Sequence, residues 1–210
     1  MDLYLIRHGE STANRDHMHA AWLPMPLTEA GIEQAKAAGN YLKNVSFDRF
    51  YCSDVYRTVQ TFDYAFGADH PREYSALLRE ANSGDLAGKT HADCAAEYGE
   101  LYGRIRTTWE FNLVGGESGD QVIARAAAFL KEMEALPEDV KCVAAVSHGG
   151  LIRAMAAHLV HQPLGSFPMA MSNCGVSVLR YDRKKGVWNI VHWNIGCQLG
   201  DGNATDGIGK

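Results

Sequence analysis

The sequence has few of the features that mark secreted, metal-clasped, nucleic-acid-binding or membrane-spanning proteins. Its five cysteines are odd in number, lie far apart and never form Cys-x-x-Cys, so neither a disulfide framework nor a structural zinc site is indicated. There is no block of basic residues, and 20 Lys and Arg against 25 Asp and Glu give a net charge of −5, which disfavours nucleic acid or an anionic membrane as partner. The apolar run before Arg7 is too short for a secretory signal or a membrane span. We therefore expect a soluble, cytoplasmic protein.

The composition is that of a globular protein. Of the 210 residues, 46% are hydrophobic and 21% are charged, which is enough apolar material for a sizeable core. We expect one domain over residues 1–199. Residues 200–210 are Gly-rich and polar with almost nothing to bury, so we expect them to be disordered.

A unit of apolar strand, polar turn and helix occurs three times along the chain. The units are residues 2–6 followed by Arg7-His8-Gly9 and a helix from Thr28 to about Lys43, residues 47–52 followed by Ser53-Asp54 and helical spacing from Val55, and residues 141–146 followed by Ser147-His148-Gly149-Gly150 and a helix over residues 151–160. Short apolar runs bounded by turn residues are typical of buried strands. Strands that alternate with helices predict an α/β fold, a three-layer sandwich with a mostly parallel central sheet flanked by helices.

The other segments complete this prediction. Ser118 begins a capping box before a long amphipathic helix. Residues 175–181 and 187–193 are rich in β-formers and predict a hairpin at an antiparallel edge of the sheet. Residues 82–117 lack clean periodicity, apart from a short helix that begins near Thr90, and we interpret them as an insertion or lid.

The polar turns that follow the predicted strands hold side chains that could bind a ligand together. In a parallel sheet the ligand crevice lies outside the carboxyl ends of the strands, and those ends carry Arg7, His8, Arg57 and His148. Cations gathered in a crevice repel one another unless an anion lies between them, and a planar guanidinium binds phosphate oxygens in a bidentate way. The sequence therefore predicts a phosphate site.

A phosphate site that carries out chemistry needs a nucleophile and a proton donor. A neutral imidazole can attack phosphorus and form a phosphohistidine that water later hydrolyses, and His8 or His148 could serve. Expelling an alkoxide also requires an acid. The residues alone leave Glu10 and Glu80 open for that role.

Six blocks of the sequence, in order, resemble the motifs of the histidine phosphatase superfamily, the group that contains the cofactor-dependent phosphoglycerate mutases. The blocks are Arg7-His8-Gly9-Glu10-Ser11 with Asn14, Pro26-Leu27-Thr28 with Gly31 and Gln34-Ala35, Ser53-Asp54 with Arg57-Thr58 and Thr61, Leu78-Arg79-Glu80 with Gly84 and Gly88, Gly115-Gly116-Glu117-Ser118, and Ser147-His148-Gly149-Gly150. The resemblance implies a phosphoglycerate mutase-like fold and a metal-independent phosphatase without a cofactor, which acts on a small-molecule phosphomonoester.

The resemblance also implies roles for individual residues. His8 is then the nucleophile and Glu80 the proton donor. Arg7, Arg57 and His148 would bind the phosphate, with Asn14 and Gly149 beside it. The choice of Glu80 leaves Glu10 with a supporting role near the turn.

Three departures from the family pattern concern substrate choice. Met25 stands before Pro26 where Asp is common, Leu86-Ala87 replaces Trp-Glu, and Ala13 stands where the mutases usually have Trp. Longer insertions with extra basic residues, which hold the second acidic group in mutases, are not evident. We therefore predict a phosphatase and keep a mutase as the alternative.

Two hypotheses from other functional classes remain. The first is a metallohydrolase, suggested by Asp16-His17-Met18-His19 and by His158 and His161, although further ligands would be needed. The second is a phosphate-binding regulator without turnover, which should have lost His8 or Glu80. Substrate selection is expected from residues 15–25 and 82–113, whose side chains either line the mouth of the site or pack the insertion onto the body. The candidates are Met18, His19, Trp22, Tyr98, Tyr102, Arg104, Arg106 and Trp109.

Overall fold

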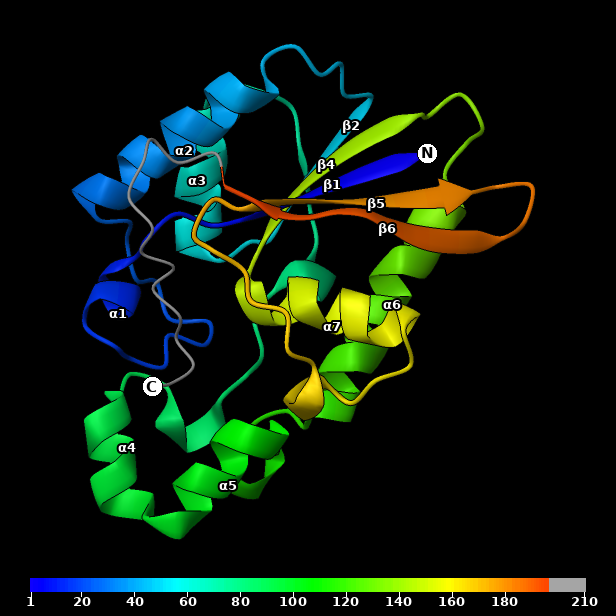
Figure 1. Ribbon diagram of the computed structural model, residues 1–210. Coiled ribbons are helices and arrows are strands. Elements are labelled where there is room, and N and C mark those ends of the chain that lie inside the picture. The colour runs from blue at the N-terminus through cyan, green and yellow to red at the C-terminus, as the bar shows by residue number, and fades with distance from the viewer. Residues whose placement is uncertain (197–210) are drawn as a thin grey trace.

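The computed structural model describes residues 1–196, so the expected tail over residues 200–210 and the end of the expected domain lie outside the described residues. Strands and helices alternate along most of this length (Figure 1). The elements are β1 Asp2–Arg7, α1 Thr12–Arg15, α2 Glu29–Leu42, β2 Arg49–Cys52, α3 Tyr56–Phe66, β3 Glu73–Tyr74, α4 His91–Tyr98, α5 Glu100–Thr108, α6 Gly119–Glu134, β4 Cys142–Ser147, α7 Gly149–Leu159, β5 Val176–Asp182 and β6 Val187–Ile195.

The strands form one six-stranded sheet in the order β3-β2-β4-β1-β5-β6. β4 pairs in parallel with β1 and β2, and β2 pairs in parallel with β3. The predicted hairpin is present, because β5 and β6 pair antiparallel and β5 runs antiparallel to β1. The prediction of a mostly parallel sheet with an antiparallel edge is therefore confirmed.

Alternate residues of the central strands supply two separate cores. Leu3 and Leu5 of β1 face a core that α6 and α7 close. Ile6 faces a second core, which contains Leu42 of α2 and Phe62 of α3. Because side chains alternate across a strand, this division places the two helix pairs on opposite faces of the sheet, as Figure 1 shows. The arrangement is the predicted three-layer sandwich.

The register of the central strands fixes where the polar turns lie. Arg7 at the end of β1 pairs with Ser147 at the end of β4, so the next residues of the two strands, His8 and His148, leave the sheet side by side. The backbone nitrogen of Ser53, after β2, donates to the carbonyl of Val146 at 2.9 Å. The three turns that carry the expected site residues therefore meet at one edge of the sheet.

Residues 82–117 contain more regular structure than the sequence indicates. The helix expected near Thr90 is α4, capped by Thr90 and Asp93. A second helix, α5, was not predicted; its Tyr102 and Ile105 are buried in the core that α6 and α7 share. Both helices lie beyond the edge of the sheet where β1 ends (Figure 1).

Two other elements begin a few residues away from where the sequence predicts them. The strand expected over residues 47–52 begins at Arg49. The helix expected over residues 151–160 begins at Gly149, because His148 is already extended and serves as its N-terminal cap. Two glycines weaken a helical pattern in the sequence, so the first turn of α7 was not recognised.

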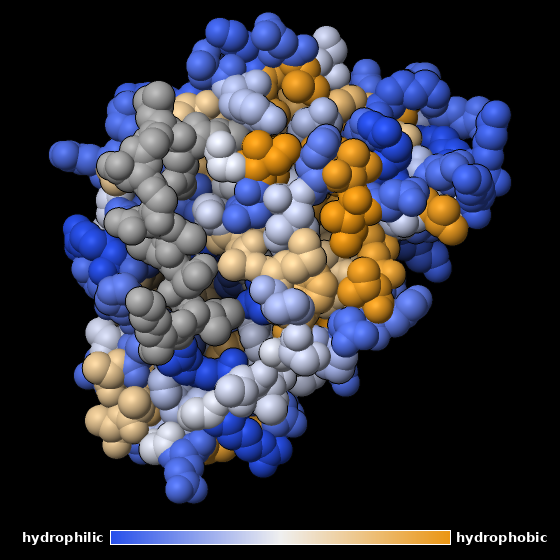
Figure 2. All heavy atoms as spheres, in the orientation of Figure 1, coloured by the Kyte–Doolittle hydropathy of each residue, from blue (hydrophilic) through white to orange (hydrophobic). Residues whose placement is uncertain are grey.

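The visible surface is mainly hydrophilic. Figure 2 shows that the most hydrophobic residues of this face gather mainly near β5 and β6, while the part over α4 and α5 mixes hydrophilic with weakly hydrophobic residues. Within residues 1–196, none of the helices is both long enough and apolar enough to span a bilayer.

Candidate active site

His8 lies immediately after β1 and is only 3% exposed. Its Nδ1 lies 2.7 Å from the carbonyl oxygen of Gly9, to which it must donate, so the lone pair resides on Nε2. Arg57 Nε donates to that Nε2 at 3.1 Å. Burial, followed by the charges of Arg57 and Arg7, holds the pKa of His8 well below 6.5. The ring is therefore a neutral imidazole whose Nε2 can act as a nucleophile.

The turn that carries His8 depends on close backbone packing. A Cβ on Gly9 would lie 2.4 Å from the carbonyl oxygen of Gly31 in α2, so only glycine fits here. The nitrogen of Gly9 donates to Thr61 Oγ1 at 3.0 Å. Residues of the second and third sequence blocks thus support the turn that carries His8.

Arg57 lies in the first turn of α3 and is 1% exposed. Its Nη2 donates to the carbonyl of Ala21 at 2.8 Å and to Nδ1 of His148 at 3.0 Å. Burial lowers the pKa of the guanidinium to about 10, so it stays charged at neutral pH. The printed hydrogen bonds of Arg57 go to carbonyl oxygens and imidazole nitrogens, and a buried cation in such surroundings is suited to hold an anion.

His148 is fully buried and faces Arg57 rather than the cavity. An arginine can only donate, so Nδ1 of His148 accepts and its Nε2–H donates to Ser53 Oγ at 3.0 Å. Burial and the Arg57 charge hold the pKa of His148 well below 6.5. In this arrangement His148 orients Arg57.

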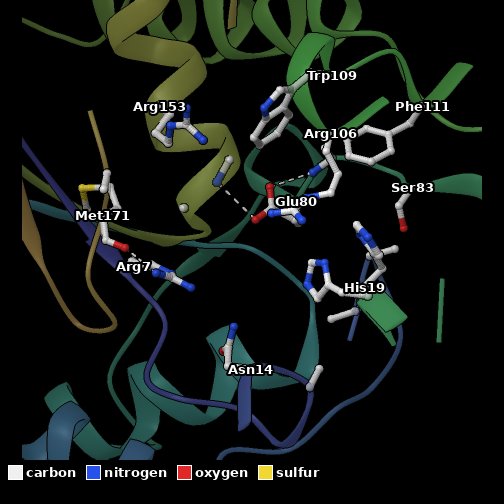
Figure 3. Close-up of a pocket in the computed structure, with 18 of the residues that line it drawn as sticks. Arg7, Asn14, His19, Glu80, Ser83, Arg106, Trp109, Phe111, Arg153 and Met171 are labelled. Carbon is white, nitrogen blue, oxygen red and sulfur yellow. Dashed lines mark hydrogen bonds between the residues drawn. The ribbon is translucent and has the colours of Figure 1, made fainter. Parts of the chain in front are cut away.

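Arg7 and Asn14 point into the cavity in Figure 3. A guanidinium nitrogen of Arg7 donates to the carbonyl of Met171. A Cβ on Gly149 would lie 3.2 Å from Arg7 Nε, so this glycine leaves room for the arginine. The amide oxygen of Asn14 accepts from the Ser11 backbone at 3.0 Å, which turns its amide nitrogen, a donor, toward the cavity.

Glu80 lines the same cavity and Glu10 does not. The Glu80 carboxylate accepts from the backbone nitrogens of Ala81 at 2.8 Å and of Gly150 at 3.2 Å. Glu10 instead accepts from the hydroxyl of Thr28 at 2.6 Å, next to the start of α2. The sequence alone left the proton donor open between Glu10 and Glu80, and the geometry favours Glu80.

The backbone around Glu80 is held by an ion pair that the sequence did not reveal. Arg125 of α6 pairs with Glu117 at 2.9 Å and donates to the carbonyls of Leu77 and Glu80, both at 3.1 Å. Glu117 also accepts from the nitrogen of Asn82 at 2.7 Å. Glu117 belongs to one of the six sequence blocks. Arg125 belongs to none of them, so its contact with the backbone around Glu80 could be found only from the structure.

The cavity has a volume of about 810 Å³ and extends well beyond Arg7, His8, Asn14 and Arg57. Of the residues expected at the mouth, Met18, His19, Arg106 and Trp109 line it, whereas Trp22, Tyr98, Tyr102 and Arg104 do not. Trp22 instead donates to the Glu80 carbonyl at 2.8 Å. Ser83, His91 and Phe111 also line it; they lie in the expected segment 82–113 but were not singled out. Arg153 and residues 165–171 line it from outside the expected segments.

The residues that suggested a metal do not assemble into a metal site. Among residues 1–196, no group of three or more His, Cys, Asp and Glu side chains could hold an ion. Asp16 pairs with Arg15 at 2.8 Å on the surface. His158 and His161 lie at the far end of α7 and are not part of the cavity lining.

Phosphatases and phosphoglycerate mutases are among the proteins similar to this chain. Adenosylcobalamin/alpha-ribazole phosphatase of Salmonella typhimurium is 34% identical over 169 residues, which cover 79% of this chain and 83% of that protein. A 2,3-bisphosphoglycerate-dependent phosphoglycerate mutase of Bradyrhizobium diazoefficiens is 33% identical over 162 residues, 73% of this chain and 78% of that one. The crystal structure of the alpha-ribazole phosphatase from Shigella flexneri superposes with a TM-score of 0.83 and 28% identity, covering 97% of this chain and all of that one. The family model of the histidine phosphatase superfamily, branch 1, matches residues 3–196, and the chain belongs to this family.

Proposed function

We propose that this protein hydrolyses a small phosphomonoester through a phosphohistidine on His8, with Glu80 as proton donor. The observation that carries the proposal is the unprotonated Nε2 of buried His8 in a cavity that Arg7, Arg57 and the Glu80 carboxyl also line. A nucleophile, an anion clamp and an acid are the parts that a two-step phosphoryl transfer requires.

In the first step, Nε2 of His8 attacks phosphorus while the bond from phosphorus to the ester oxygen breaks. Arg7, Arg57 and the Asn14 amide donate to the phosphoryl oxygens, and His148 keeps Arg57 in place. Glu80 gives its proton to the departing oxygen, so the product leaves as an alcohol. In the second step, the Glu80 carboxylate takes a proton from water, which attacks phosphorus and releases phosphate and neutral His8.

The two arginines have a second effect on the nucleophile. Burial, together with the charges of Arg57 and Arg7, lowers the pKa of His8 and keeps it unprotonated in the free protein, so no proton must be removed before attack. The substrate dianion then compensates the positive charge of Arg7 and Arg57. The clamp therefore prepares the nucleophile as well as binding the phosphate.

Hydrolysis is favoured over mutase chemistry by the lining of the cavity. A mutase would need further cations to hold the second acidic group of its substrate. Arg153 lines the cavity, but it donates to the carbonyl of Phe167 at 2.7 Å and lies 5.2 Å from the Trp109 ring. The volume of the cavity suits a leaving group larger than glycerate, in keeping with the relative that is named an alpha-ribazole phosphatase.

The test is to trap the intermediate. Rapid quench with labelled substrate should give an acid-labile, base-stable phosphoenzyme, which His8→Ala should lose together with turnover. We expect activity in the presence of chelators and inhibition by vanadate, which mimics five-coordinate phosphorus. Near wild-type turnover in His8→Ala would refute the assignment, and loss in chelator with rescue by zinc or manganese would favour a metallohydrolase.

A further inference from the structure

A short backbone ladder brings two histidines together at the outer part of the cavity. Residues 17–19 pair with residues 88–91: His91 N donates to the carbonyl of His17 at 2.9 Å, and His19 N donates to that of Lys89 at 3.0 Å. The rings of His19 and His91 then lie 4.7 Å apart, centroid to centroid. Both line the cavity, and Figure 3 shows His19 opposite Arg7.

The hydroxyl of Tyr102 on α5 connects these two rings. It lies 2.9 Å from Nε2 of His19 and 2.6 Å from Nδ1 of His91. A phenol has one proton, so it donates to one histidine and accepts from the other. The remaining ring nitrogens, His19 Nδ1 and His91 Nε2, must therefore present one donor and one acceptor between them, whichever way the Tyr102 proton points.

The pairing of one donor with one acceptor requires that the rings of His19 and His91 both be neutral, and their surroundings keep them neutral. Burial, with His91 and Arg106 nearby, lowers the pKa of His19 to about 4. Burial, Arg106 and His17 also lower the pKa of His91. The Arg106 guanidinium lies 5.8 Å from the Tyr102 ring centroid, beside both histidines. At neutral pH the pair therefore remains one donor and one acceptor.

A buried hydroxyl in the same cavity lacks a partner. Ser83 is 3% exposed and lines the cavity, and its Oγ has no hydrogen-bond partner among residues 1–196. An unpaired buried hydroxyl costs about 1–3 kcal/mol and calls for an explanation. A ligand group that both donates and accepts would supply one.

Resting on the phosphatase function proposed above, we propose that the outer cavity recognises the hydroxyl groups of a sugar or polyol leaving group through His19 Nδ1, His91 Nε2 and Ser83 Oγ. A hydroxyl both donates and accepts, so it satisfies the two ring nitrogens in either tautomeric arrangement. A carboxylate can only accept, and an alkyl chain does neither. The subsite thus favours hydroxylated esters over apolar ones.

The test compares esters of equal carbon number with and without hydroxyls. Ribose 5-phosphate, glucose 6-phosphate and glycerol 1-phosphate are paired with pentyl, hexyl and propyl phosphate. Because a site built for hydroxyls leaves its polar groups unpaired with an alkyl chain, the kcat/KM of the best hydroxylated ester should exceed that of its alkyl partner by about 10²–10³. Equal or reversed ratios in all three pairs would overturn the inference.

Matched substitutions separate recognition from support of the fold. His19→Gln and His91→Asn keep a polar atom near Tyr102 but remove the ring nitrogen that faces the cavity. They should lower the ratio of hydroxylated to alkyl kcat/KM at least tenfold, as should Ser83→Ala. His19→Asn and His91→Gln, which keep the cavity-facing polar atom, should retain more of the ratio, and His192→Asn on β6 should retain all of it. An unchanged ratio in His19→Gln and His91→Asn would mean that the rings only brace α5.

The reference substrate is p-nitrophenyl phosphate. If the wild-type protein neither hydrolyses it nor forms a phosphoenzyme, the proposed function has failed. If it does both but shows no preference for hydroxylated esters, the inference alone has failed.

Discussion

Oε2 of Glu80 accepts a hydrogen bond from the backbone nitrogen of Gly150 at 3.2 Å, which ties the proposed acid to the first turn of α7. The same turn begins at His148, so one helix end positions both Glu80 and, through His148, Arg57. A Cβ on Gly150 would lie 2.2 Å from Oε1 of Glu80 and 2.9 Å from the Trp109 ring. The carboxylate and this glycine therefore occupy space that no larger residue can share.

Gly150→Ala should displace the Glu80 carboxylate while leaving His8 in place. We expect kcat for alkyl phosphates to fall by about 10²-fold, within the range attributed to general acid catalysis, with a smaller loss for p-nitrophenyl phosphate. Gly196→Ala is the control, because a Cβ there meets nothing within 4 Å and Gly196 is not part of the cavity lining. Steady-state measurement of kcat with both substrates tests this prediction. Equal losses of kcat would show that Gly150 supports the cavity as a whole rather than the position of Glu80.

Glu80→Gln removes the proton without removing the side chain. Alkyl phosphate hydrolysis should slow by about 10²–10⁴ because an alkoxide leaves poorly, whereas an aryl oxide needs little assistance. With p-nitrophenyl phosphate we expect a burst of p-nitrophenol and then slow turnover, since discharge of phosphohistidine also uses Glu80. Glu10→Gln and Asp85→Asn should show neither effect, and either of them reproducing it would relocate the acid.

The sequence predicted most of the central layer and the meeting of the polar turns at one end of the strands, for a physical reason. Each strand ends in its own polar turn, so His8, Arg57 and His148 sit in local patterns that parallel pairing then brings together. Glu10 and Glu80 could not be separated from the residues alone, because the choice depends on the Thr28 hydroxyl that Glu10 meets in space.

The outer cavity was much less predictable. Ser83, His91 and residues 165–171 line it without any motif, since tertiary packing alone brings them together. The same holds for Arg125, whose carbonyl partners lie 45–48 residues away in sequence. In α5, Gly103 interrupts the periodicity, and burial of Tyr102 and Ile105 decides the helix.

Arg125→Met should weaken both the fold and the acid. The pair with Glu117 is largely buried, and breaking such a pair costs about 3–5 kcal/mol because a charge is left without its partner. We expect a loss of that order in urea unfolding, and in the folded protein a lower kcat with alkyl phosphates than with p-nitrophenyl phosphate. Arg180→Met, which breaks the exposed pair with Asp2, should cost at most about 1 kcal/mol. A similar small cost for Arg125→Met would contradict the bracing role.

The buried neutral histidines should make stability depend on pH. The pKa values of His8 and His148 lie well below 6.5 in the folded protein, whereas both titrate near 6.5 in the unfolded chain. Below pH 6.5 the unfolded chain therefore binds more protons, and the free energy of unfolding falls by up to about 1.4 kcal/mol per histidine and pH unit. Urea unfolding between pH 7.5 and 5 should show this decline, and His8→Asn should reduce its slope by up to one histidine's share. An unchanged slope in His8→Asn would mean that His8 protonates normally in the fold.

The products formed from 3-phosphoglycerate distinguish hydrolysis from mutase chemistry. A mutase must hold its phosphoenzyme against water while the bound product reorients, which requires a closed site and a clamp for the second acidic group. Here Arg153 is engaged by Phe167 and Trp109, and Arg106 lies beside His19 and His91 at the outer part of the cavity. We therefore expect free phosphate as the main product even when a bisphosphoglycerate primer is added, measured by phosphorus NMR alongside a phosphate assay. We expect no appreciable isomer, and formation of 2-phosphoglycerate faster than release of phosphate would identify a mutase.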